Sequence, residues 1–244
     1  MTRRYVVLPD VPSVAVTTAD RLIAAGRNAI RRRGRFTLAL SGGTTPLAVC
    51  PLLVVPPRVR QLDWTRVEFF FSDERAVPPD HPDSNYASER AALLDHLPGV
   101  RAHQVHRMLG EATDLDAAAR AYEMEMRAAF GVTGPHAPPF DLIWLGMGRD
   151  GHTASLFPGS AALEEKDRWV VANWAPGPRA WRMTLTFPVL NAAREAMFVV
   201  TGADKSDAFR AIRSGRTDLP AARVNARRTV WIVDAHAAGE ALAA

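Results

Sequence analysis

The sequence has one cysteine and only two lysines among its 244 residues. With Cys50 alone, an intrachain disulfide and a cysteine-based metal site are both excluded. No apolar run reaches the 18 residues that a membrane span needs, and the apolar run after Arg3 and Arg4 is too short for a signal peptide. These absences predict a soluble protein of the cytoplasm that does not bind a membrane.

Arginine supplies almost all of the positive charge, and the formal net charge is +4. The arginines are scattered along the chain, except for residues 31–33 at the end of a predicted helix, where cations interact favourably with the helix dipole. Proteins that bind nucleic acid gather such charge in a patch, so we do not expect nucleic acid as a partner. A basic surface also suits a phosphorylated metabolite.

Apolar, strand-like runs alternate with helix-like segments along the whole chain. We predict strands over residues 5–8, 36–40, 67–71, 141–145, 169–173, 183–186, 196–200 and 229–233, and helices over residues 15–33, 86–94, 115–130 and 208–212. This alternation is typical of a mostly parallel sheet with helices on both faces. We therefore expect a single α/β domain over residues 1–244, with three αβα layers and a doubly wound, Rossmann-like sheet.

Polar clusters follow the carboxyl ends of four predicted strands, at residues 41–45, 72–75, 146–152 and 201–205. In open α/β sheets, ligands bind at that edge of the sheet. The sequence therefore predicts that the four clusters converge on one site.

The first cluster consists of Ser41, Gly42, Gly43, Thr44 and Thr45, in a predicted strand-to-helix turn. The glycines allow the backbone to approach an anion, while the hydroxyls and the first N–H groups of the next helix donate hydrogen bonds. A plain helix cap is the alternative, since serine and threonine are common caps. The turn matches neither the Walker pattern nor G-x-G-x-x-G, which makes a dinucleotide an unlikely ligand.

The cluster at residues 201–205 places Lys205 in the first turn of a predicted helix. The helix dipole disfavours a cation there, unless an anion is bound nearby. A solvated surface lysine is the alternative.

In the cluster at residues 72–75, Asp73, Glu74 and Arg75 carry three consecutive charges after an apolar run. Such charges need solvent, each other or a ligand. Arg75 is the candidate for contact with substrate, because its guanidinium binds oxyanions with a fixed fork of donors. An internal ion pair that stiffens the loop is the alternative.

Asp150 and His152 stand two residues apart on the glycine-rich turn after residues 142–145. Histidine can take and return a proton near neutral pH, and a nearby aspartate can orient its ring and stabilise the imidazolium. We predict that His152 is a catalytic base; a structural histidine is the alternative. A zinc site is not expected, because no second histidine follows at four residues and no cysteine cluster exists.

Together these motifs resemble the 6-phosphogluconolactonases, in the superfamily that also contains the glucosamine-6-phosphate deaminases. The resemblance rests on residues 40–46, 71–75, 78–86, 146–148, 150–159, 182–191 and 201–205, in the family's order. It implies a NagB-type sheet and hydrolysis of 6-phospho-D-glucono-1,5-lactone to 6-phospho-D-gluconate, in the oxidative pentose phosphate pathway. It also implies that neither a metal nor an organic cofactor is used. We expect a monomer or a homodimer.

The resemblance also implies roles for individual residues. His152 would be the general base and Asp150 its neighbour in the site. The substrate or its phosphate would contact Arg75, Arg182, Asp73, Lys205 and the turn from Ser41 to Thr45, and Arg179 is a further candidate for an anion contact. The chain departs from the family's pattern at Pro51. This proline should end or kink the helix after Pro46 early.

Two other functions compete with the lactonase. The deaminases carry an acidic residue a few positions after the histidine, in a Phe-Asn-Glu-Pro context, whereas residues 155–158 here read Ser-Leu-Phe-Pro and offer no carboxylate. A non-catalytic sugar-phosphate sensor would keep the anion-binding turns, but it would have no reason to keep Asp150 beside His152. Both comparisons favour the hydrolase.

Overall fold

The computed structural model describes residues 2–177 and 179–240, and its centre is a six-stranded parallel sheet. The strand order is β1 (Thr2–Leu8), β9 (Arg228–Asp234), β8 (Ala196–Val200), β5 (Leu142–Leu145), β2 (Phe36–Leu40) and β3 (Val67–Phe71). Every neighbouring pair runs parallel. Within the described residues, no helix is long and apolar enough to cross a membrane.

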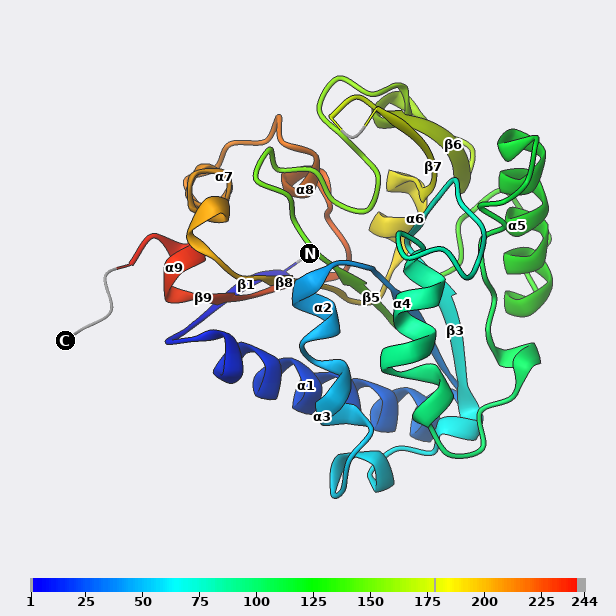
Figure 1. Cartoon of the computed structure of the whole chain (residues 1–244), viewed down its shortest axis with the longest axis horizontal. Helices are drawn as coiled ribbons and strands as arrows, with labels where there is room; N and C mark the ends of the chain where they lie inside the picture. Colours follow the sequence, from blue (N-terminus) through cyan, green and yellow to red (C-terminus); the bar gives the residue numbers. More distant parts are fainter. Residues whose placement is uncertain (1, 178, 241–244) are drawn as a thin grey trace.

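Successive side chains of the sheet enter two separate hydrophobic cores. Leu142 and Trp144 pack into one core, whereas Ile143 and Leu145 pack into the other. The first core is covered by α1 (Val11–Arg33), α3 (Cys50–Leu53) and α4 (Asn85–Ala92). The second is covered by α5 (Leu115–Phe130), α6 (Phe187–Ala192), α7 (Ser206–Arg213), α8 (Pro220–Arg223) and α9 (Ala235–Ala238). Figure 1 shows α1 and α3 below the sheet and α7 and α8 above it. The expected three-layer αβα fold is confirmed.

A second, three-stranded antiparallel sheet consists of β4 (Asp73–Arg75), β7 (Ala180–Leu185) and β6 (Val170–Ala175). This sheet corrects two expectations. The charged residues 73–75 form a strand rather than a loop, and the strands expected at 169–173 and 183–186 stay outside the parallel sheet. The physical reason is the short connection between β6 and β7, which closes a hairpin and so requires antiparallel pairing.

The helices begin and end at local signals, with small shifts from the predicted bounds. The side chain of Asp10 accepts a hydrogen bond from Ser13 N–H, so α1 begins at Val11 rather than at residue 15, and Gly34 ends it in the left-handed conformation. The predicted interruption after Pro46 is confirmed: α2 (Thr44–Leu47) stops, and Pro51 stands in the first turn of α3, where its missing N–H costs nothing.

The strand order reverses between β2 and β5. From β2 the chain continues outward to β3, whereas from β5 it continues in the opposite direction to β8 and β9. The loops after β2 and β5 therefore diverge and leave a crevice at the carboxyl ends of the strands. This crevice is where the first and third polar clusters meet.

Candidate active site

A pocket of about 230 Å³ occupies the crevice. Residues from all four polar clusters line it, together with side chains from β7, β8 and α4. The lining consists of Ser41, Gly42, Gly43, Thr45, Pro46, Asp73, Arg75, Asn85, Gly146, Met147, Gly148, His152, Ala154, Arg182, Val199, Thr201 and Lys205. The expected convergence of the four clusters is therefore confirmed.

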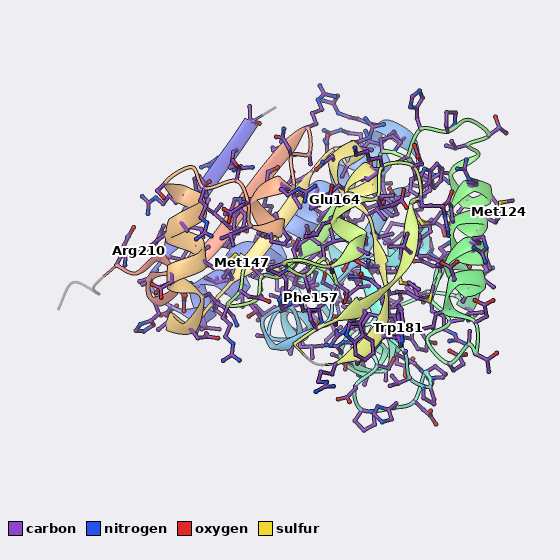
Figure 2. All side chains as sticks on the ribbon, turned by 90° about the horizontal axis from the view of Figure 1, so that it is seen from above. Met124, Met147, Phe157, Glu164, Trp181 and Arg210 are labelled. Atoms are coloured by element: carbon purple, nitrogen blue, oxygen red, sulfur yellow. The ribbon has the colours of Figure 1, made fainter. Side chains whose placement is uncertain are left out.

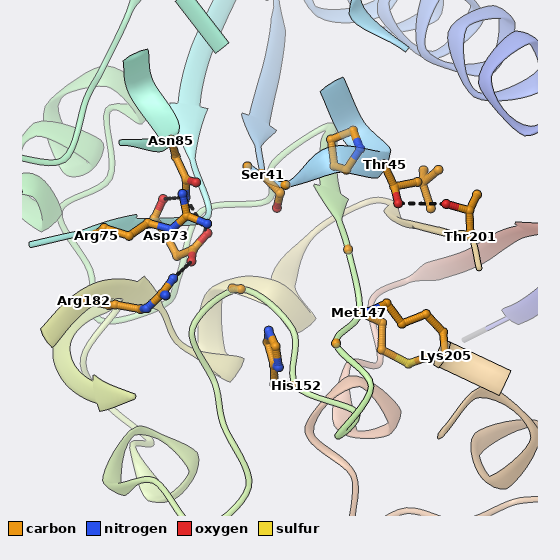
Figure 3. A pocket seen from close by; sticks show the side chains of 17 residues that line it. Ser41, Thr45, Asp73, Arg75, Asn85, Met147, His152, Arg182, Thr201 and Lys205 are labelled. Atoms are coloured by element: carbon orange, nitrogen blue, oxygen red, sulfur yellow. Dashed lines mark hydrogen bonds and ion pairs between the residues drawn. The ribbon is translucent and has the colours of Figure 1, made fainter. Parts of the chain in front are cut away.

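His152 projects into the pocket from the turn after β5 and forms a hydrogen bond with Asp150 (Figure 3). The distance from Nδ1 to Oδ1 is 2.5 Å, and the same oxygen accepts a bond from the His152 backbone N–H. Partial burial raises the pKa of Asp150, but the hydrogen bonds and charge of His152 outweigh burial and leave the pKa below its ordinary value. The carboxylate is thus ionised and only accepts. In the neutral ring, Nδ1 then carries the proton, and Nε2 has the lone pair that can take another.

The imidazole of His152 fits into the space left by the missing side chain of Gly148. A Cβ atom at position 148 would lie 2.1 Å from Cε1 and 2.2 Å from Nδ1 of the ring, far inside van der Waals contact. The ring also packs against Phe157, with 4.3 Å between centroids. Phe157 and Met147 are buried and lie well inside the outline of the molecule in Figure 2, whereas Met124 on α5 lies at its edge. Gly148 and Phe157 therefore both restrict the position of the ring.

Arg75 and Arg182 stand directly opposite each other on β4 and β7. The Nη1 atom of Arg75 donates to the carbonyl of Asp83 at 2.6 Å, while Nη1 of Arg182 lies 4.0 Å from a carboxylate oxygen of Asp73. Burial lowers the pKa of Arg182, and the nearby charge of Arg75 lowers it further, against the opposing effect of Asp73. Like charges across a strand pair are destabilising, so this end of the pocket suits an anion.

Asp73 lines the pocket but directs its oxygens into the protein. The carboxylate is buried and accepts hydrogen bonds from Ser155 Oγ at 2.7 Å, Asn85 Nδ2 at 3.1 Å and Ser72 Oγ at 3.3 Å. With these donors in place, Asp73 holds the pocket wall together from three different segments.

The turn after β2 presents its backbone, rather than the Ser41 hydroxyl, to the pocket. Ser41 Oγ donates to the carbonyl of Trp144 at 2.7 Å and lies 2.6 Å from Ser72 Oγ. Glycine is required at position 42, since a Cβ there would lie 1.7 Å from Oδ1 of Asn85. Because α2 is only four residues long, the helix expected to supply N–H groups contributes little, and the turn lines the pocket mainly through Gly42 and Gly43.

Thr45, Thr201 and Lys205 form the end of the pocket opposite the two arginines. The hydroxyls of Thr45 and Thr201 lie 2.9 Å apart and join the two turns, and Lys205 Nζ pairs with Asp204 at 2.7 Å. In Figure 3, His152 lies between this group and the group of Arg75 and Arg182. The side chain of Thr44, another predicted contact, lies outside the described part of the structure.

Arg179 has a different environment from the other predicted contacts. It is exposed on the turn between β6 and β7, has a positive φ of 52°, and is not among the described residues that line the pocket. Among the lining residues that sequence reasoning missed, Asn85 had one available signal, its place in the matched segment 78–86. Met147 and Ala154 had the same kind of signal, from the matched segments 146–148 and 150–159. Val199 had none, because an apolar side chain near the end of a buried strand is an ordinary core residue. Across the described residues, no group of three or more His, Cys, Asp or Glu is placed to hold a metal ion.

The model of the glucosamine-6-phosphate isomerases/6-phosphogluconolactonase family matches residues 9–231. This chain belongs to that family. It is 38% identical to the 6-phosphogluconolactonase of Mycobacterium tuberculosis over 242 residues, 96% of each chain. It is 41% identical to that of Synechocystis over 213 residues, 86% of each chain. The crystal structure of the Thermotoga maritima 6-phosphogluconolactonase superposes with a TM-score of 0.81 at 29% identity, covering 96% of this chain and 100% of that one. The resemblance expected from the motifs is confirmed.

Proposed function

We propose that this enzyme hydrolyses 6-phospho-D-glucono-1,5-lactone to 6-phospho-D-gluconate, the lactonase step of the oxidative pentose phosphate pathway. The observation that carries the proposal is the His152–Asp150 pair, which lies between two cationic ends of one pocket. The substrate has a phosphate at one end and, at the other, a carbonyl that gains negative charge during hydrolysis. A base between two anion sites matches that distribution of charge.

The phosphate would bind at the Lys205 end. Lys205, the hydroxyls of Thr45 and Thr201 and the backbone of Gly42 and Gly43 supply donors there. Lys205 would exchange its present partner, the exposed carboxylate of Asp204, for the phosphate. Binding at this end would fix the distance from the phosphate to the lactone carbonyl and bring the carbonyl carbon beside His152.

His152 would then activate water. Nε2 takes a proton from the water as its oxygen attacks the carbonyl carbon, and Asp150 stabilises the imidazolium that results. The carbonyl oxygen becomes an oxyanion, which we place near the guanidinium groups of Arg75 and Arg182, with backbone N–H groups of the glycine turns as the alternative donors.

Collapse of the tetrahedral intermediate would break the bond between the carbonyl carbon and the ring oxygen. The imidazolium of His152 returns its proton to that oxygen, which leaves as the C5 hydroxyl, and the new carboxylic acid ionises. One histidine serves both steps, so the proposed mechanism requires neither a metal ion nor an organic cofactor. On the sequence arguments above, we propose that the enzyme acts in the cytoplasm, as a monomer or a homodimer.

The alternative within the family is a glucosamine-6-phosphate deaminase. Ring opening and amine loss need further proton transfers, and the segment after His152 supplies no carboxylate for them. Ser155 is fully buried against Asp73, and Phe157 packs on the His152 ring. Two buried carboxylates stand in this wall, and both are already hydrogen-bonded. Asp73 accepts from Ser155, Asn85 and Ser72. Glu74 accepts from the backbone N–H groups of Arg75, Asn85 and Tyr86.

The test is a lactonase assay with freshly generated substrate, corrected for spontaneous hydrolysis and run beside the unphosphorylated lactone. We expect turnover of the phosphorylated lactone, and a fall in kcat of about 10²–10⁴-fold in His152→Ala, the usual range for one general acid–base group. Near-normal turnover by that variant would remove His152 from the mechanism. Ammonia release from glucosamine 6-phosphate would overturn the lactonase proposal in favour of the deaminase.

A further inference from the structure

We propose that Ser155 is a positioning residue for His152, which it holds in the reactive orientation through a hydrogen bond to Asp73. The proposal rests on the proposed function, because it assigns Ser155 a task in the same reaction. Ser155 is fully buried and is absent from the pocket lining, so it would act through the turn that carries His152 rather than on substrate.

The three polar groups of Ser155 bond to the three strands of the antiparallel sheet. Its hydroxyl donates to Oδ2 of Asp73 on β4 at 2.7 Å, and its backbone N–H donates to Oγ1 of Thr184 on β7 at 3.1 Å. Its carbonyl accepts from Nδ2 of Asn173 on β6 at 2.7 Å. One residue of the His152 loop is thus fastened to every strand of a sheet whose β4 and β7 also carry Arg75 and Arg182.

The turn next to His152 is strained and needs such an anchor. Leu156 N–H donates to the carbonyl of Thr153 at 2.9 Å, which closes a tight turn, and Ala154 within it has a φ of 47°. This left-handed conformation is unfavourable for alanine and persists only where the surroundings impose it. Ala154 lines the pocket two residues from His152. If the strained backbone at Ala154 relaxed, the imidazole of His152 would therefore move.

The other end of the loop is tied to the parallel sheet. Thr153 Oγ1 donates to the carbonyl of Gly146 at 2.8 Å, and Gly148 N–H donates to the carbonyl of His152 at 3.0 Å. The loop thus spans two sheets, with Gly146 on one side and Ser155 on the other. Loss of the Ser155 hydroxyl would release this end of the loop from β4 while its backbone bonds to β6 and β7 remain, and His152 would no longer be set relative to Arg75.

Asp73 connects this anchor to the rest of the pocket wall. Its other oxygen accepts from Asn85 Nδ2 and Ser72 Oγ, and Ser72 Oγ lies 2.6 Å from Ser41 Oγ. Buried polar contacts therefore connect the turn after β2, through Ser72 and Asp73, with the His152 loop. A group at the centre of such a buried network fixes geometry, because each bond restrains two segments at once.

The test compares Ser155→Ala with Ser160→Ala in the full chain. Ser160 is the matched control: its hydroxyl accepts from the same Asn173 Nδ2 at 3.1 Å, but it lies outside the turn. For Ser155→Ala we expect kcat to fall by about 10–100-fold with KM within about threefold, since a shift near 1 Å in a reacting group costs about 10²-fold. Ser160→Ala should keep both constants near the wild-type values.

A second readout does not depend on substrate. The ring proton signals of His152, assigned by their absence in His152→Ala, should move in the NMR spectrum of Ser155→Ala and stay in place in Ser160→Ala. If Ser155→Ala does not fold, Ser155→Cys replaces it, because the thiol keeps the volume and donates only weakly; it should show the same displacement.

Three outcomes would overturn the proposal. An unchanged His152 signal in a folded Ser155 variant, or a lowered melting temperature with unchanged kcat, would mean that the bond only stabilises the fold. A raised KM at constant kcat would assign Ser155 to substrate binding. If the wild-type protein does not hydrolyse the lactone, the proposed function fails, and the displacement of the His152 signal still decides whether Ser155 positions the ring.

Discussion

The contact between Gly148 and the imidazole of His152 allows a sharp test of ring position. In Gly148→Ala, the new methyl carbon would lie 2.1 Å from Cε1 of His152, and ordinary contact begins at 3.4 Å. The ring must therefore move by about 1.3 Å, the difference between these distances. Because the side chain of His152 is 30% exposed, it can move toward solvent without unfolding its surroundings.

This displacement should lower kcat strongly and stability little. A misplacement near 1 Å costs about 10²-fold in rate, and the variant should thus lose about two orders of magnitude in kcat. The backbone of Gly148 has no positive φ, so alanine brings no backbone strain of that kind. The expected change in the free energy of unfolding is within about 1 kcal/mol, from rearranged surface contacts alone.

The assay measures lactone hydrolysis and thermal unfolding for Gly148→Ala beside His152→Ala and Gly134→Ala. Gly134 is a loop glycine where an added Cβ meets nothing within 4 Å, so it controls for the substitution itself. A folded Gly148→Ala variant with kcat within threefold of wild type would refute the reasoning. It would show either that the ring tolerates displacement or that His152 is not the base.

Two further predictions concern charge. Lys205→Ala should raise KM about tenfold or more while kcat changes less than threefold, since a hydrogen bond to a charged group contributes about 1.5–3 kcal/mol; an unchanged KM would argue against a phosphate contact. Burial lowers the pKa of His106, but its bonds to Glu125 at 2.7 Å and Glu68 at 3.0 Å outweigh burial and raise the pKa from 6.5 to about 9. Protonated His106 therefore adds to the free energy of unfolding. This contribution, up to about 3 kcal/mol, is complete below pH 6.5 and is lost as the pH rises through 9. Urea unfolding of the wild type and of His106→Gln between pH 6 and 10 measures this contribution. If the free energy of unfolding changes with pH in the same way in both proteins, the prediction is wrong.

The sequence predicted most of the fold because runs of apolar residues indicate which segments are buried. The apolar run at residues 142–145 is buried on both faces, as a central parallel strand requires, and the glycine-rich turn after it predicted the place of His152. The end of α1 before Gly34 and the interruption of the helix after Pro46 followed from capping and proline chemistry, whereas the start of α1 was predicted four residues too late. Caps, prolines and apolar runs each depend on residues that are close together in the chain, so they can be recognised from one sequence.

The three-stranded sheet of β4, β7 and β6 could not be predicted from such local signals. Strand β4 has three charged residues, too few and too polar to show any hydrophobic periodicity, and its partner β7 lies more than a hundred residues later in the chain. Whether a charged segment remains a turn or becomes a strand depends on that distant partner. Sequence reasoning therefore placed Arg75 and Arg182 in the same site without showing that they face each other.

The sequence by itself determined the αβα architecture, the edge of the sheet that forms the site, and the pairing of Asp150 with His152. Each follows from what is next to what along the chain: strands alternate with helices, polar clusters follow strands, and the two residues are two positions apart. Only the tertiary structure decided that Asp73 and the Ser41 hydroxyl bond within the protein, that Arg75 opposes Arg182, and that Ser155 fastens the His152 turn to a second sheet. Those relations join segments that are far apart in sequence. They arise when buried polar groups find partners during packing, and no local pattern of residues records which partner is chosen.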